Sequence, residues 1–151
     1  PAHNAGHAYT ALVKGAFAPA QQTGGLEELA MIGGGYGLWT GCAAGVGSSS
    51  EAPVSTRIAD GLACRIPDAE ALDLMLRHVD EVVEVGDDEI AAAMRLLFAA
   101  THNVAEGAGA ASLAGALKSR DRLRGRKVGL TLCGANVDSD VFARVLAGGS
   151  H

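Results

Sequence analysis

The sequence predicts an α/β domain with a parallel sheet that is covered by helices on both faces. Short apolar or β-branched runs alternate along the chain with segments that carry apolar residues at helical spacing. Two of the expected strands end in small and polar residues, and ligands of such sheets bind beyond the carboxyl ends of the strands. We therefore expect residues 1–151 to form a single α/β domain.

The amino-terminal part contains one clear strand signal. Residues 29–32 are an apolar run that ends in a glycine cluster, and a second apolar stretch follows. This order is typical of a strand, a glycine-rich turn and a helix. Residues 1–26 are rich in Gly, Ala and Gln, and we expect a helix and a loop there.

Helices and strands alternate more regularly from residue 68 onward. Asp68 and Asp87 each precede an apolar stripe at helical spacing, so each is expected to cap a helix. The stripes are Leu72, Met75, Leu76 and Val79 in the first helix and Ile90, Ala93, Met94, Leu97 and Phe98 in the second. Residues 81–85 are β-branched and predict a strand between these helices.

The last third of the chain continues this alternation. Residues 103–106 are expected to be extended, and a helix over 109–120 should place Leu113, Ala114 and Leu117 inward. A buried strand is expected over 127–133 and a final helix over 138–146.

Composition excludes several classes of protein. The net charge is -5, and the one basic stretch, residues 120–127, is interrupted by Asp121 and Leu123, so a nucleic-acid partner is not expected. Three widely spaced cysteines favour neither a disulfide framework nor a zinc site, and His3 and His7 lack a third metal ligand. Since no segment has the length of a membrane span, we expect a cytoplasmic protein without a membrane partner.

The glycine cluster is the first candidate binding site. Backbone N–H groups of Gly33, Gly34, Gly35 and Gly37 can converge on a phosphate because no Cβ blocks the approach. The segment is neither a P-loop nor a dinucleotide-binding fingerprint. A tight turn between a strand and a helix accounts for the same residues.

Two further residues stand at the ends of expected elements. Cys133 ends a strand and is followed by Gly134, where its thiol can hydrogen-bond a ligand or serve as a small buried hydrophobe. Glu106 precedes a helix that begins with small residues. Its carboxylate can line a pocket and tune protonation, or it can compensate the helix dipole.

Four segments occur in an order that resembles the serine/threonine dehydratases of the fold-type II, pyridoxal-phosphate (PLP) dependent family. They are residues 33–37, 55–63, 103–110 and 132–138, and the close match extends over residues 54–147, whereas residues 1–53 match poorly or are shortened. The resemblance implies the three-layer parallel sheet of the tryptophan synthase β-like fold. It also implies that the chain is the carboxy-terminal half of such an enzyme and lacks part of the fold.

The resemblance also implies roles for single residues. The four glycines would bind the phosphate of PLP, Cys133 would face the pyridine nitrogen, and Gly61 would border the site. Glu106 would lie beside the ring as a catalytic group. Lys14 is the only lysine in the amino-terminal part, so it is the candidate for the catalytic lysine that forms a Schiff base with the cofactor.

The implied activity is that of an ammonia-lyase that dehydrates and deaminates threonine or serine to a 2-oxo acid and ammonia. The resemblance further implies a small amino-acid substrate and a homodimer. The lysine motif of the family is not matched around Lys14. The alternative is therefore a non-catalytic module, or a pseudoenzyme, that binds PLP or phosphate without the Schiff-base lysine.

Overall fold

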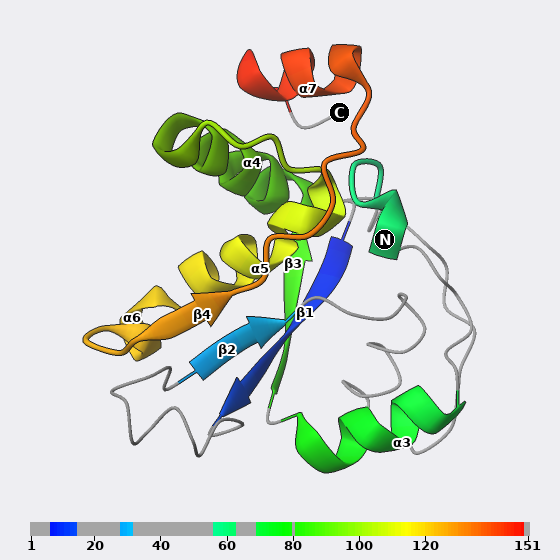
Figure 1. Ribbon diagram of the computed structural model, residues 1–151, viewed down its shortest axis with the longest axis vertical. Coiled ribbons are helices and arrows are strands. Elements are labelled where there is room, and N and C mark those ends of the chain that lie inside the picture. The colour runs from blue at the N-terminus through cyan, green and yellow to red at the C-terminus, as the bar shows by residue number, and fades with distance from the viewer. Residues whose placement is uncertain (1–6, 15–27, 32–55, 63–68, 80, 150–151) are drawn as a thin grey trace, which may run out of the picture.

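The structure is a computed structural model that describes residues 7–14, 28–31, 56–62, 69–79 and 81–149 (Figure 1). The strands in this part of the chain are β1 (His7–Lys14), β2 (Glu28–Met31), β3 (Glu81–Gly86) and β4 (Val128–Leu130). The helices are the 3-10 turn η1 (Asp60–Leu62), α3 (Ala69–His78), α4 (Asp87–Thr101), α5 (Gly107–Lys118), α6 (Arg120–Leu123) and α7 (Ser139–Leu146).

The four strands form one sheet in the order β3-β1-β2-β4. β2 and β4 are parallel, with Ala30 opposite Leu130. β1 is antiparallel to both of its neighbours, so β2, β3 and β4 share one direction and β1 has the other. The expected parallel arrangement therefore holds for three of the strands, and β1 makes this part of the sheet mixed.

β1 corrects the expectation of a helix and a loop over residues 1–26. Tyr9, Thr10 and Val13 are residue types that favour strands, but the alanines between them hide the pattern. β1 is a central strand, since Ala11 pairs with Met31 on one side and with Val82 on the other. Hydrogen bonding on both edges determines the conformation, and local composition does not.

The carboxy-terminal elements follow the prediction with shifted ends. α5 begins two residues earlier than expected and stops at Lys118, and the chain then turns into α6. Strand β4 covers only three residues of the expected strand over 127–133. Two leucines expected to face inward, Leu76 and Leu117, are exposed.

The helices lie on both sides of the strands. α5 packs against β1, β2 and β3, α4 packs against α5, and α7 packs against α4. In Figure 1, α3 lies on the other side of the strands from α4 and α5. In the part of the chain that the structure describes, no helix combines the length and apolarity needed to cross a membrane.

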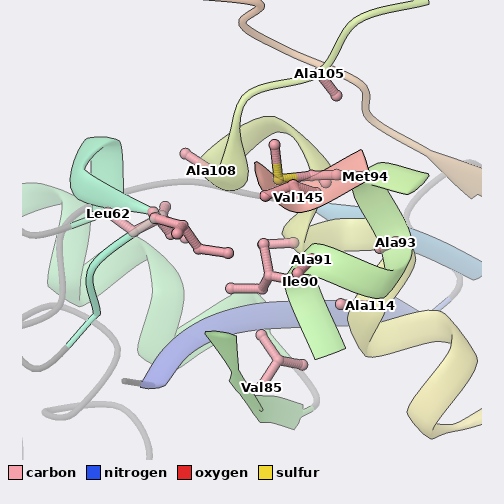
Figure 2. Close-up of a cluster of buried hydrophobic side chains, with 14 of the residues drawn as sticks. Leu62, Val85, Ile90, Ala91, Ala93, Met94, Ala105, Ala108, Ala114 and Val145 are labelled. Atoms are coloured by element: carbon pink, nitrogen blue, oxygen red, sulfur yellow. The ribbon is translucent and has the colours of Figure 1, made fainter. Parts of the chain in front are cut away.

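The core is aliphatic and rich in alanine, as expected from a sequence with one tryptophan. Figure 2 shows Ile90, Met94 and Val85 around the centre of this cluster, with Ala114 of α5 close by. Between Gly107 and Ala116, every residue of α5 except Leu113 is small, and all of these small residues are buried. A helix face of small side chains lets the sheet and α4 approach its backbone closely.

The carboxy-terminal helix is attached to α4 by both apolar and polar contacts. Phe142 packs edge to face against Phe98 with ring centroids 5.5 Å apart, and Val145 is buried. The guanidinium of Arg95 donates hydrogen bonds to the carbonyl oxygens of Val145 (3.1 Å) and Gly149 (3.4 Å). A cation at the carboxyl end of α7 is also favourably placed for the helix dipole.

Candidate functional site

Two loops meet the first turn of α5, one formed by residues 56–62 and the other by residues 131–136. The distances show how close the backbones are. A Cβ atom on Gly107 would lie 1.9 Å from the carbonyl oxygen of Ile58, and one on Gly109 would lie 2.2 Å from the carbonyl oxygen of Cys133. Both contacts are shorter than any side chain allows, so glycine is required at both positions.

Glu106 stands between the two loops. It is the residue that precedes α5, but its carboxylate makes no hydrogen bond that caps the helix. Instead, Oε2 accepts a hydrogen bond from the backbone N–H of Asn136 (3.1 Å), and the backbone N–H of Glu106 donates to the carbonyl of Gly134 (3.1 Å). The carboxylate is therefore held toward the segment 131–136, as expected of a side chain that lines a site, and it stands at the helix end where its charge also compensates the dipole.

Gly134 is a residue of this site whose importance was not predicted. Its φ is +81°, and a Cβ atom there would lie 2.2 Å from Oε1 of Glu106. Glycine is therefore needed both for the left-handed backbone and for the space that the carboxylate occupies. The available signal was a glycine directly after an expected strand end, which is typical of a turn.

Gly61 borders the same carboxylate from the other loop. A Cβ atom on Gly61 would lie 3.0 Å from Cβ of Ala108 and 3.7 Å from Oε1 of Glu106. The residue belongs to η1, whose Leu62 is buried in the core. The structure thus brings together Gly61 and Glu106, which the sequence placed 45 residues apart in one expected site.

Cys133 is a free, exposed thiol in the segment that follows β4. It lies beyond the end of the strand, and its exposure contradicts the alternative of a small buried hydrophobe. Ser112 of α5 is 2% exposed, and its hydroxyl donates a 2.7 Å hydrogen bond to the carbonyl of Thr131, two residues before the thiol. This bond and the close contact at Gly109 attach the segment to α5.

Asp87 has a different role from the expected helix cap. Gly86 is the capping residue of α4, and its N–H donates to Oε2 of Glu89 (2.7 Å). The carboxylate of Asp87 instead accepts hydrogen bonds from the hydroxyl of Thr56 (2.6 Å) and the backbone N–H of Arg57 (2.8 Å). Sequence reasoning missed this contact because its partners lie about thirty residues upstream.

The remaining candidates lie wholly or partly outside the described residues. Gly33, Gly34, Gly35 and Gly37 belong to the range 32–55, which the structure does not describe. Lys14 is the last residue of β1, with its Cα opposite that of Glu28, and only its backbone is described. Within the described ranges, no group of three or more His, Cys, Asp or Glu residues is arranged to hold a metal ion.

Comparison with known proteins identifies the family. The profile of the pyridoxal-phosphate dependent enzymes matches residues 29–134. The chain is 37% identical over 89 residues to an L-threonine ammonia-lyase of Thermotoga maritima, covering 59% of this chain and 22% of the relative. It is 45% identical over 92 residues to a phenylserine dehydratase of Ralstonia pickettii, covering 59% of this chain and 28% of the relative. The chain thus spans less than a third of either relative.

The fold agrees with this assignment. The crystal structure of a threonine deaminase from T.th. matches with a TM-score of 0.60 and 30% sequence identity, over 68% of this chain and 37% of that one. The expected tryptophan synthase β-like α/β fold is therefore confirmed, and so is PLP as the cofactor of the family. The chain belongs to the pyridoxal-phosphate dependent enzymes, the family whose dehydratases its sequence resembles.

Proposed function

We propose that the protein containing this chain is a PLP-dependent ammonia-lyase that converts threonine or serine to a 2-oxo acid and ammonia. The observation that carries this proposal is the meeting of Glu106, Gly61 and the segment 133–136 at the first turn of α5. The names of two relatives support the substrate class, since threonine and phenylserine both carry a hydroxyl group on the β carbon.

The described residues fit the ring end of the cofactor. Gly61 and Gly134 have no side chains, and a Cβ on either would approach the Glu106 carboxylate. The Glu106 carboxylate and the exposed thiol of Cys133 offer polar partners for a flat, polar ring. When bound, PLP supplies the electron sink that stabilises negative charge on the α carbon of the substrate.

We assign Cys133 to the pyridine nitrogen as an uncharged hydrogen-bonding partner. Such a partner leaves the nitrogen largely unprotonated, which moderates the electron sink and favours loss of the β-hydroxyl over other reactions. Glu106 lies beside the ring and controls protonation there, because Asn136 fixes the position of its Oε2 atom. Gly61 forms a border of the site, near the same Oε1 atom of Glu106 that Gly134 approaches.

Gly33, Gly34, Gly35 and Gly37 would hold the phosphate. The support for this role is the pairing of β2 with β4, since parallel strands end at the same edge of a sheet. Gly33 follows the end of β2 by two residues, and Cys133 follows the end of β4 by three. The phosphate loop and the thiol would then approach the cofactor from neighbouring strands.

From the family resemblance we propose Lys14 as the lysine that binds the cofactor and removes the α-proton of the substrate, although its pairing with Glu28 sets it at the edge of the sheet opposite the carboxyl ends of β2 and β4. We also propose that residues 1–151 form one α/β domain, because one sheet joins strands from β1 to β4. A cytoplasmic homodimer acting on a small amino acid completes the proposal. The wide spacing of the cysteines supports a reducing compartment.

The test is to supply the full-length protein with PLP and then with threonine or serine. We expect an absorbance band at about 410–420 nm that borohydride removes, and release of ammonia and a 2-oxo acid. Lys14→Ala should abolish both the band and the activity, whereas Lys118→Ala, a change of an exposed lysine, should preserve them.

Each contrary result has a defined meaning. A protein that never develops the band, even in the presence of excess PLP, would refute the proposed function. PLP binding without ammonia release would instead support the non-catalytic alternative. An intact band in Lys14→Ala would exclude Lys14 as the cofactor-binding lysine.

A further inference from the structure

We propose that Asp87 is a positioning residue whose buried carboxylate holds the loop 56–62 against the first turn of α5, and thereby sets the border of the site at Gly61. Only the expected effect on PLP binding rests on the proposed function, whereas the effect of Asp87 on the loop 56–62 does not depend on it. The carboxylate of Asp87 bonds to Thr56 and Arg57 at the start of the loop, so its effect on the site would be transmitted through the loop.

The contacts of Asp87 use both carboxylate oxygens. The side chain belongs to a residue that is 7% exposed, and Oδ1 accepts from the Thr56 hydroxyl while Oδ2 accepts from the Arg57 N–H. The Thr56 hydroxyl oxygen in turn accepts a 3.1 Å hydrogen bond from the N–H of Ala59. One carboxylate at the start of α4 therefore organises a connected set of hydrogen bonds in the loop.

The carboxylate is also favourably placed as a charge. Asp87 is the first residue of α4, where the free N–H groups and the helix dipole stabilise a negative charge. A buried carboxylate with two charge-assisted hydrogen bonds is held firmly, since leaving its charge without these partners in a buried place is costly. A rigid anchor is what a positioning role requires.

The loop transmits its position to the site through close backbone contacts. A Cβ atom on Gly107 would lie only 1.9 Å from the carbonyl oxygen of Ile58. The backbones of the loop and α5 therefore touch, with no side chain between them. Ala59, which precedes η1, and Leu62, the last residue of η1, are both buried. A displacement at Thr56 should therefore shift Gly61, which lies next to Glu106, because the closely packed backbones leave no room for the loop to adjust in between.

Asp88 provides a matched control. It is the next residue of the same helix turn and carries the same charge, but it is exposed. Asp87→Asn and Asp88→Asn thus remove one negative charge from the same helix terminus. Any difference between the two variants reports the hydrogen bonds to Thr56 and Arg57 and not the dipole of α4.

The experiment compares four variants of the full-length protein: Asp87→Asn, Asp88→Asn, Thr56→Val and Thr56→Ser. Hydrogen exchange is measured for the amides of residues 56–62, PLP affinity by titration of its absorbance, and global stability by the unfolding midpoint. We expect Asp87→Asn and Thr56→Val to speed exchange in the loop and to weaken PLP binding by about tenfold. Asp88→Asn and Thr56→Ser should match the wild type.

Rescue by serine separates positioning from general stability, because serine keeps the hydroxyl and loses only the methyl group. Equal PLP affinity and loop exchange in Asp87→Asn and Asp88→Asn would overturn the proposal. So would faster exchange spread over the whole chain in both Asp87→Asn and Thr56→Val. If Asp87→Asn does not fold, the loop exchange and PLP affinity of Thr56→Val, compared with those of Thr56→Ser, test the proposal in its place. If the wild type binds no PLP, the proposed function fails, and loop exchange alone decides the role of Asp87.

Discussion

The two loops that flank the first turn of α5 both pack closely on a glycine of that helix, but their polar contacts differ. The loop 56–62 packs on Gly107 and donates two hydrogen bonds to the buried carboxylate of Asp87. The segment 131–136 packs on Gly109, accepts a hydrogen bond from the neutral hydroxyl of Ser112, and donates one to the carboxylate of Glu106. Because Gly134 of the second loop adjoins the Glu106 carboxylate, that loop should be the more sensitive to added volume, and the loop 56–62 to loss of its buried polar partner.

The largest effect in this comparison is expected from Gly134→Ala. The substitution forces a side chain into a backbone with φ +81° and places Cβ 2.2 Å from Oε1 of Glu106. The left-handed conformation alone costs roughly 1–2 kcal/mol, and the clash adds about 1–3 kcal/mol. Gly134→Ala should therefore lower the free energy of unfolding, measured by chemical denaturation. It should also abolish PLP binding, measured by the absorbance of the cofactor.

Gly125→Ala is the matched control for Gly134→Ala. Gly125 has a similar φ of +78°, but a Cβ there would have no neighbour within 4 Å. It should show the conformational cost and no loss of PLP affinity. Equal effects of the two substitutions on PLP affinity would mean that the space beside Glu106 is irrelevant to the cofactor.

An intermediate effect is expected from Ser112→Ala. The change removes the hydrogen bond to the Thr131 carbonyl and leaves that acceptor at the edge of a buried region. The free energy of unfolding should fall by about 1 kcal/mol, and exchange should rise around residues 131–134. Ser139→Ala, at the exposed start of α7, is the control. A loop that exchanges no faster in Ser112→Ala would show that packing at Gly109 suffices to hold it.

The smallest effect is expected from Asp140→Asn. Its carboxylate is exposed, so it should contribute much less to the stability of the fold than the buried carboxylate of Asp87. The hydrogen bond from Arg144, 2.8 Å long, lowers the pKa of Asp140 below its usual range. A lowered pKa stabilises the folded state at pH values above the unfolded pKa, and this contribution is lost as the pH falls through the folded pKa.

The measurement for Asp140→Asn is the difference in unfolding midpoint from the wild type. It should be small at neutral pH, shrink in acid, and shrink again at high salt because the pair is exposed. A difference that grows on acidification would contradict the assigned cause of the pKa shift.

The sequence predicted best those elements whose evidence is local. α4 forms where the apolar stripe after Asp87 predicted a helix, and α7 ends at the expected Leu146, because both stripes repeat at helical spacing. Glu106, Gly61 and Cys133 were assigned to one site from the family resemblance alone, and the structure places Glu106 next to Gly61 and to Gly134, the neighbour of Cys133.

What the sequence did not predict depends on partners that are remote along the chain. β1 is a strand because β2 and β3 pair with its two edges, and neither pairing is visible in residues 7–14. β4 pairs with β2 over three residues, from Val128 to Leu130, and the apolar run over 127–133 did not reveal where this pairing ends. The contact of Asp87 with Thr56 spans 31 residues, so a local pattern showed only an acidic residue before a helix.

The small side chains of α5 have a consequence for redesign of the protein. Because the glycines Gly107 and Gly109 have no side chain and the buried alanines have only a methyl group, trimming the buried face of that helix offers almost no larger binding volume. Enlarging any of them would instead push the sheet and α4 apart. Acceptance of bulkier amino acids would have to be engineered through the loops on either side, with the helix kept as a fixed spacer.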